Sequence, residues 1–307
     1  MALALSTSWN AHRFNNVKGM LFEIEKLGFT ELELSFNLTS SMILEIGKLA
    51  KQTGFKIASV HNFSPIPDGL PRDRALPDCY SMSSLDKEER RLALKYTKRT
   101  IDTASFLGAK VVVLHCGRVE MHDQTRKLIA LYDRDCLGTD EFREIKEEFI
   151  RERASISQPF FANTLDSLRE LSQYALEKSI NLGVENRFYY REIPSFDEIS
   201  LILSEFKDSN VFYWHDFGHA QLMEKLGFNL HRDYLDSYKD ALLGVHLHNI
   251  IGCLDHQAPF IGELDFSDFK QYLKKDTLKV IEAHYPAKAD DIKQSKVLLE
   301  RLFDGIL

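Results

Sequence analysis

The stretch Gly244-Val245-His246-Leu247-His248-Asn249 is a short apolar run that ends in imidazole side chains. Five other short runs of strand-like composition also end in a side chain that can bind a metal. These endings are Ser59-Val60-His61, Val113-Leu114-His115, Gly183-Val184-Glu185, Trp214-His215-Asp216 and Val280-Ile281-Glu282. A single ending of this kind would mean little. Six on successive strands indicate one shared site where the strands finish.

Strand-like and helical segments alternate eight times along the chain. We expect strands over residues 2–7, 31–35, 55–61, 110–115, 181–185, 211–216, 242–248 and 278–284. Helices are expected over 17–27, 42–50, 84–107, 165–178, 195–206, 219–240 with a break near Gly227, 266–275 and 290–303. Ser195 and Glu198 have the spacing of a capping box. The alternation predicts an α/β fold, a (β/α)8 barrel that forms one domain over residues 1–307. A doubly wound open sheet is the alternative, but no glycine-rich nucleotide-binding motif follows an early strand.

Three segments fall outside this alternation. Residues 62–84 are rich in proline, serine and aspartate and predict a long loop, as do residues 250–265. Residues 116–160, after the fourth strand, are charged and include a helical stretch over 140–153. We interpret them as a helical insertion in the barrel and not as a second domain. The insertion is either a solvated spacer or a lid or dimer surface, which leaves a homo-oligomer open.

The composition is that of an ordinary soluble globular protein. The chain has 307 residues, of which 44% are apolar and 28% charged, and a formal net charge of −7. This charge disfavours a globally basic nucleic-acid binder. The cysteines, Cys79, Cys116, Cys136 and Cys253, form no CxxC pair, which indicates a reducing compartment. We see neither a signal peptide nor an apolar run long enough to span a membrane, so we predict a cytoplasmic protein without membrane contact.

The strand endings predict a metal site at one end of the barrel. Because side chains alternate along a strand, His246 and His248 share a face, and Glu282 shares one with His284. Imidazole and carboxylate ligands together suit zinc, manganese, iron or cobalt and not calcium. Each residue also has a plain structural explanation: a lone buried histidine is usually hydrogen-bonded core, and Asp216 could be a helix cap. The six endings together favour a bound divalent metal.

The chain resembles the xylose isomerase-like barrel superfamily, which holds sugar isomerases and epimerases alongside endonuclease IV. The resemblance covers nearly the whole chain. Its motifs are Ser59-Val-His61, Val-Val-Leu-His115, Gly-Val-Glu185-Asn186, His215-Asp216-Phe-Gly-His219-Ala, Val-His246-Leu-His-Asn, Asp255-His256 with Ile-Gly-Glu-Leu-Asp-Phe, and Ile-Glu282. They are more specific for the superfamily than for a reaction.

Resemblance to the epimerase branch implies one metal held by Glu185, Asp216, His246 and Glu282. It also implies proton transfer next to a carbonyl through an enediolate-like intermediate, with Glu185 and Glu282 as base and acid on opposite sides of a sugar or sugar phosphate. Arg187 could contact a hydroxyl or a phosphate, or it could be a surface arginine.

Resemblance to endonuclease IV implies instead three zinc ions and a phosphodiesterase that acts on abasic DNA. The ligands would be His61, His115, Glu185, Asp216, His219, His246, Asp255, His256 and Glu282, and His248 is a further candidate for metal or substrate. Two positions depart from the pattern: Asp255 and His256 are adjacent where that family separates them by one residue, and Asn249 stands where an aspartate is usual. Few basic residues besides Arg72 and Arg74 follow the early strands, so nucleic acid is disfavoured.

A dehydratase or a non-catalytic relative on the same barrel is the third alternative. The fold alone does not rank these three functions.

Overall fold

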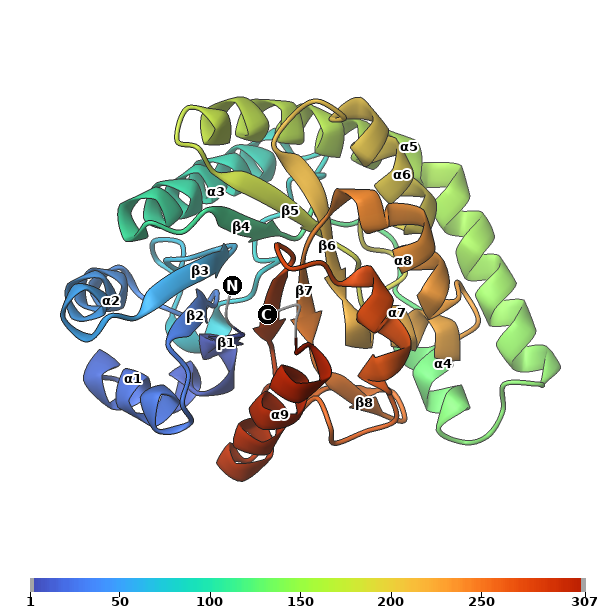
Figure 1. Ribbon diagram of the computed structural model, residues 1–307. Coiled ribbons are helices and arrows are strands. Elements are labelled where there is room, and N and C mark those ends of the chain that lie inside the picture. The colour runs from blue at the N-terminus through green and yellow to red at the C-terminus, as the bar shows by residue number, and fades with distance from the viewer. Residues whose placement is uncertain (1–2, 305–307) are drawn as a thin grey trace.

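Eight parallel strands close into a barrel in the computed structural model, which describes residues 3–304 (Figure 1). In the order in which they pair around the barrel, they are β1 (Ala4–Ser6), β2 (Glu31–Leu34), β3 (Lys56–His61), β4 (Val111–Leu114), β5 (Asn181–Glu185), β6 (Val211–Asp216), β7 (Leu242–Leu247) and β10 (Leu278–Ile281), and β10 pairs with β1. The predicted (β/α)8 barrel is confirmed. Ala2, at the start of the predicted first strand, lies outside the described residues.

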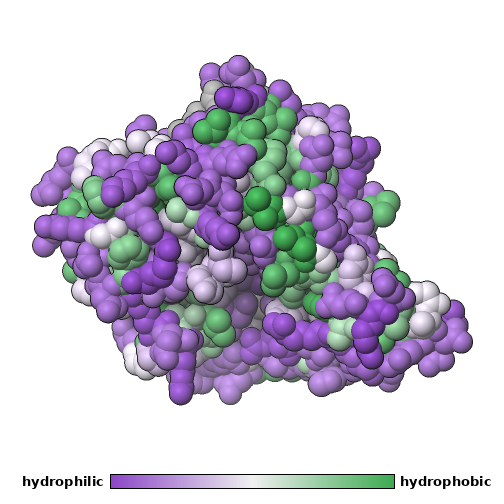
Figure 2. Space-filling view, turned by 90° about the horizontal axis from the view of Figure 1, so that it is seen from below, coloured by the Kyte–Doolittle hydropathy of each residue, from purple (hydrophilic) through white to green (hydrophobic). Residues whose placement is uncertain are grey.

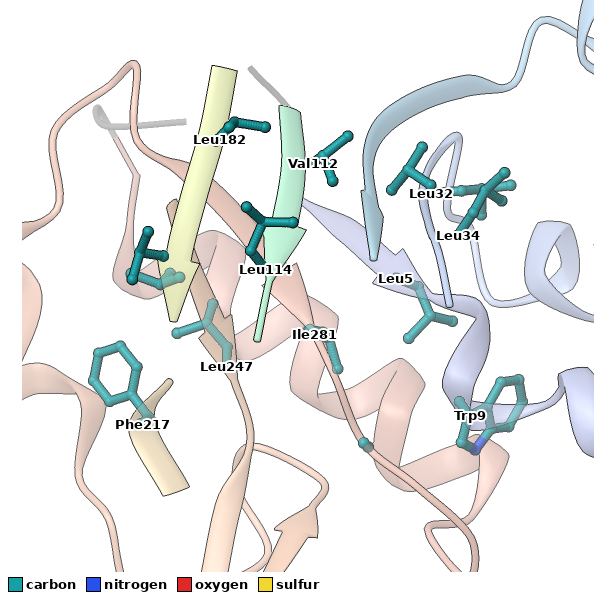
Figure 3. Packing of buried hydrophobic residues seen from close by; sticks show 14 of the residues in the cluster. Leu5, Trp9, Leu32, Leu34, Val112, Leu114, Leu182, Phe217, Leu247 and Ile281 are labelled. Atoms are coloured by element: carbon teal, nitrogen blue, oxygen red, sulfur yellow. The ribbon is translucent and has the colours of Figure 1, made fainter. Parts of the chain in front are cut away.

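Both faces of the barrel wall are buried, so successive side chains enter two different cores. The interior cluster consists of Ala4, Val111, Val113, Trp214, Leu278 and Val280. The residues between them on the strands, such as Val112, Leu114 and Ile281, pack outwards against the helices (Figure 3). This alternation decides which side chains lie above the interior cluster at the ends of the strands.

Trp214 fills the middle of the barrel against glycines on both neighbouring strands. A Cβ atom at Gly244 would lie 2.2 Å from the Trp214 ring, and one at Gly183 would lie 3.1 Å from it. The indole is fully buried, and its Nε1 has no hydrogen-bond partner. The indole ring of Trp214 therefore packs directly beneath the site, and it fits there because Gly183 and Gly244 have no side chains.

Helices cover the outside of the barrel. They are α1 (Val17–Lys26), α2 (Ser40–Thr53), α3 (Lys87–Leu107), α5 (Asp140–Leu176), α6 (Phe196–Glu205), α7 (Phe217–Lys225), α8 (His231–Tyr238) and α9 (Ala289–Leu302). The predicted helix over 219–240 begins at Phe217 and is interrupted as expected. The capping box of Ser195 and Glu198 is present at the start of α6.

The insertion after β4 differs from the prediction. It contains the short helix α4 (Thr125–Tyr132), and the two helices predicted over 140–153 and 165–178 are one continuous α5 that passes through Pro159. Phe149, Phe160 and Leu168 are buried in the main core, so one apolar face persists on both sides of the proline. Arg153 on α5 forms a buried ion pair with Glu198 on α6, with Nη2 and Oε2 2.7 Å apart.

The predicted loop over 250–265 also contains structure. Strands β8 (Asn249–Ile251) and β9 (Leu254–Gln257) form an antiparallel pair beyond the end of β7. The helix predicted over 266–275 is a 3₁₀ segment, Phe266–Tyr272. Strands β7 and β10 end at Leu247 and Ile281, before the predicted ends at His248 and His284.

The four cysteines are free thiols. Within residues 3–304, no helix combines the length and the apolar character that crossing a bilayer would require.

The packing around Trp214 predicts a graded loss of stability. Trp214→Ala should lower the free energy of unfolding by about 3–5 kcal/mol, because it leaves a cavity in the barrel. Trp214→Phe should cost clearly less, since the indole nitrogen has no partner to lose. Urea unfolding followed by circular dichroism measures both, because the chain has only one other tryptophan and fluorescence would be ambiguous. Equal losses for the two variants would contradict the packing described here.

Candidate metal centre and active site

Four buried side chains meet at the carboxyl end of the barrel, above Trp214. Glu185 and Asp216 are the last residues of β5 and β6, His246 is the last but one residue of β7, and Glu282 follows β10. The potential ligand atoms of these four residues all lie within 4.8 Å of one another. The Nδ1 atom of His246 lies 2.7 Å from Glu185 Oε1, 3.0 Å from Glu282 Oε2 and 3.6 Å from Asp216 Oδ2. These four residues, which we call the central quartet, are the predicted single-metal ligands, and the structure brings them together.

The sequence interpretation missed Glu33, a fifth member of this cluster. Glu33 on β2 is fully buried, and its Oε1 lies 3.1 Å from His246 Nε2. Its Oε2 accepts a 2.7 Å hydrogen bond from the Ser59 hydroxyl. The run Glu31-Leu-Glu-Leu was predicted as a strand, but its glutamates were not considered as site residues. Both faces of a parallel barrel are covered, and the contacts of Glu33 with His246 and Ser59 place it in the interior.

The surrounding charges shift the acidities of the quartet. Burial by itself would lower the pKa of His246, but the carboxylates of Glu282, Glu33 and Glu185 outweigh burial and raise that pKa well above its usual value. Burial would raise the pKa of Glu185, but His246 and His115 hold it well below the usual range. The pKa of Glu282 is likewise lowered against the effect of burial, chiefly by His246. Both glutamates are therefore carboxylates, each able to accept a proton.

A second group of ligand atoms lies beside the quartet. His61, His115 and Glu185 can approach one ion, and His115 Nε2 lies 2.8 Å from Glu185 Oε2. Asp78, from the loop over 62–84, lies 3.0 Å from His115 Nδ1 and was not anticipated. Arg187 is buried, with its Nη1 3.0 Å from Glu185 Oε2, so it is not a surface arginine.

A third group contains His219, His248 and His256. Asp255 joins it, since its Oδ2 lies 3.7 Å from His219 Nε2 and 3.5 Å from His256 Nε2. Adjacent residues on a strand point to opposite sides. His256 has a φ of 53°, a left-handed conformation that breaks this alternation and turns Asp255 and His256 towards the same cavity.

Four of the histidines are oriented in the same way. The Nδ1 atoms of His61, His219 and His256 lie 2.8, 3.0 and 2.9 Å from the carbonyl oxygens of Asn62, Asn186 and Glu282. His115 Nδ1 faces Asp78 instead. An Nδ1–H donated to such an acceptor leaves Nε2 free as a ligand, and this is the arrangement usual for histidines that bind metals. His248 differs: its Nδ1 accepts the His256 backbone N–H and its Nε2 lies 2.8 Å from Asp216 Oδ2, so it orients Asp216.

Asn186 supports the turn that carries Asp216. Its side-chain oxygen accepts the Asp216 N–H at 2.7 Å and the Tyr213 hydroxyl at 3.0 Å. Its amide nitrogen donates to the Asp216 carbonyl at 2.9 Å. The Asn186 side chain thus orients Asp216 through the backbone of that residue and not through its carboxylate.

All three groups face one cavity of about 840 Å³. Of the central quartet, Glu185 and Glu282 line the cavity, while Asp216 and His246 lie beneath its surface. The upper wall comes from the loop over 62–84, from α4, from the segment after β5 and from the β8–β9 pair. The insertion after β4 therefore contributes to the site, through Arg126, Ile129 and Asp133.

Comparison with known proteins agrees with this architecture. The family model described as xylose isomerase-like TIM barrel matches residues 21–302. The chain belongs to the xylose isomerase-like TIM barrel family. A search of curated protein sequences finds no match.

Solved structures of sugar epimerases share the fold. One is 3-keto-D-glucoside 4-epimerase, YcjR, from E. coli, with a TM-score of 0.69 and 19% identity over 98% of this chain and 99% of that one. A D-tagatose 3-epimerase-like protein has a TM-score of 0.66 and 18% identity over 100% and 98% of the two chains. D-allulose 3-epimerase from Methylomonas sp., in complex with D-allulose, has a TM-score of 0.66 and 13% identity over 98% and 96%. At these identities the likeness establishes the fold alone.

The contacts of Asn186 predict a loss that extends to metal binding. Asn186→Ala should lower the free energy of unfolding by about 1–3 kcal/mol, because buried polar groups lose their partners. It should also weaken binding of Co²⁺ by roughly 10–100-fold, because Asp216 loses its support. Titration calorimetry with Co²⁺ measures the second effect.

Asn210→Ala is the matched control. Asn210 is also buried and also bridges backbone and side chain, through Ile180 and Ser172, but it lies where β6 begins, at the opposite end of the barrel. The Asn210→Ala variant should be less stable than the wild type and should keep its affinity for Co²⁺. Equal affinities in the two variants would show that Asn186 has no positioning role.

Proposed function

We propose that this protein is a sugar isomerase or epimerase that requires a divalent metal and moves a proton on the carbon next to a carbonyl. The observation that carries the proposal is the central quartet at the base of a cavity, with two of its glutamates lining that cavity. The sugar epimerases that share the fold support the substrate class.

The donor set of the quartet fits a divalent metal. Three buried carboxylates and one imidazole supply the oxygen and nitrogen ligands that manganese, cobalt, iron and zinc accept. Buried carboxylates this close together repel one another, and a dication would supply the charge that His246 alone does not balance. When bound, such an ion would polarise a carbonyl oxygen of the substrate.

Glu185 and Glu282 are the proposed proton carriers. Both line the cavity and both are held ionised, so either can take a proton from a carbon next to the carbonyl. Removal of that proton gives an enediolate. The other glutamate can return a proton only after it has itself taken one up from solvent, and that return completes the reaction. Epimerisation follows if the proton returns on the opposite face.

Metal content tests the first part of the proposal. Protein purified without a histidine tag or a chelator should contain about one divalent transition metal per chain, measured by elemental analysis. Removal with EDTA should abolish sugar turnover and lower the melting temperature, and both should recover with Mn²⁺ or Co²⁺. A protein that contains no metal and takes none up would overturn the proposal.

Substitution of the glutamates tests the second part. Glu185→Gln and Glu282→Gln should each lower kcat at least roughly 100-fold on an interconvertible ketose, because each removes a group that carries a proton. Glu31→Gln is the control, since Glu31 is a buried glutamate at the start of β2, away from the quartet. Full turnover by either variant, with the metal still bound, would contradict the acid–base assignment.

A zinc phosphodiesterase is the second candidate, favoured by the two further groups of ligands around the quartet. Against it, the Arg187 guanidinium already contacts Glu185 Oε2, the oxygen that faces His61 and His115, and a cation there opposes a second metal. Two to three zinc ions per chain together with cleavage of abasic duplex DNA would establish this function in place of the first.

A further inference from the structure

We propose that the outer half of the cavity is a subsite for a second, apolar ring, and that the substrate is an uncharged keto sugar that carries such a ring as a glycoside. For the end of the substrate that reacts, the inference rests on the proposed isomerase function. It concerns a different part of the cavity, the wall above the catalytic glutamates.

The size of the cavity gives the first argument. Its volume of about 840 Å³ is near the upper end of the roughly 300–1,000 Å³ that is usual for sites of drug-sized ligands. A free hexose is much smaller than a drug-sized ligand. A hexose bound at Glu185 and Glu282 would leave the outer half of the cavity open to water.

The chemistry of the outer wall gives the second argument. Leu76, Ile251 and Leu254 come from two separate segments, line the same cavity and are 60%, 49% and 63% exposed, so exposed aliphatic surface gathers at this cavity. Phe188 and Ile129 line the same wall. Figure 2 shows hydrophobic groups gathered beside a hollow on this side of the molecule, the side that carries β8 in Figure 1. An apolar ring placed there would cover these side chains, whereas a sugar hydroxyl would not.

The charges of the lining argue against a phosphorylated substrate. The cavity is lined by two arginines, Arg126 and Arg187. The guanidinium of Arg187 is already paired with Glu185, Asp78 and Glu192. Arg126 lies over the Tyr189 ring, with 5.3 Å between its Cζ and the ring centroid, and bonds the Tyr189 hydroxyl.

Four carboxylates line the cavity outside the quartet: Asp78, Asp133, Glu192 and Asp255. Of the two lining arginines, only Arg126 is not already paired with carboxylates among the described residues, so a phosphate at the outer end would meet more negative than positive charge. An uncharged ring avoids the repulsion.

A glycosidic substituent constrains the reaction. It blocks the anomeric carbon, so the carbonyl must lie at another ring carbon. One glutamate, as a carboxylate, removes the proton from the carbon next to that carbonyl, and the electron pair of the C–H bond forms the C=C bond of an enediolate as the carbonyl electrons move to oxygen. The other glutamate, after taking up a proton from solvent, delivers that proton to the same carbon on the other face. No atom or electron is gained or lost. The keto group itself must come from an earlier oxidation of a sugar hydroxyl.

Binding of non-reactive sugars to the metal-loaded protein tests the subsite without relying on turnover. By titration calorimetry, phenyl β-glucoside should bind at least roughly tenfold more tightly than methyl β-glucoside. Glucose 6-phosphate should bind no more tightly than methyl β-glucoside. Leu254→Ala should remove most of the preference for phenyl, and Leu201→Ala, which changes a similarly exposed leucine on α6, should leave it intact.

Each alternative result has a definite meaning. Equal binding of the phenyl and methyl glucosides, or tighter binding of the phosphate, would overturn the inference. So would light scattering that shows a dimer of the wild type and a monomer of Leu254→Ala, because the leucines would then form a contact between copies. A preference for phenyl that depends on Leu254, without turnover of any keto sugar, would support the subsite and refute the isomerase function.

Discussion

The site depends on one electrostatic constraint: four carboxylates are buried around a single imidazole. Glu33, Glu185, Asp216 and Glu282 each place an oxygen within 3.6 Å of a ring nitrogen of His246. One imidazolium balances one negative charge, so the remainder must be compensated or the cluster would be costly to bury. Arg187 supplies part of that charge beside Glu185. A dication at the centre of the quartet would supply the rest.

The closed barrel brings these carboxylates together, because its parallel strands all end on the same side. The same geometry explains which parts of the site could be predicted from the sequence. Eight strands were predicted from their alternation with helical segments. Six of them carry an apolar run that ends in a polar side chain, and in a closed barrel those ends meet. The inward direction of His115, Glu185 and His246 follows from strand periodicity alone. Glu33 obeys the same rule, yet it was missed because it lies within its strand and does not follow an apolar run as the six predicted endings do. Asp78 had no periodic signal, since it reaches the site from a loop whose path depends on long-range packing.

The insertion after β4 was the least predictable part for a physical reason. Pro159 and the polar residues around it favour a break, whereas burial of Phe149 and Phe160 on one face keeps α5 continuous. A local preference of a few kcal/mol was outweighed by tertiary packing. The consequence for the site is that α4 is held over the cavity and adds Arg126 and Asp133 to its wall.

In the β8–β9 pair, the backbone conformation compensates for the adjacency of Asp255 and His256, which the endonuclease IV pattern separates by one residue. In an extended strand the adjacent Asp255 and His256 could not serve the same site. The left-handed conformation of His256, which costs roughly 1–2 kcal/mol in a non-glycine residue, restores a common direction. The cost is offset by the contacts that His256 gains: its N–H bonds His248, its Nδ1 faces the Glu282 carbonyl, and its ring stacks on those of His248 and His284 with centroids 4.1 and 3.7 Å away. Spacing along the chain is therefore a weak guide to the ligands of this site, because one dihedral angle can replace an inserted residue.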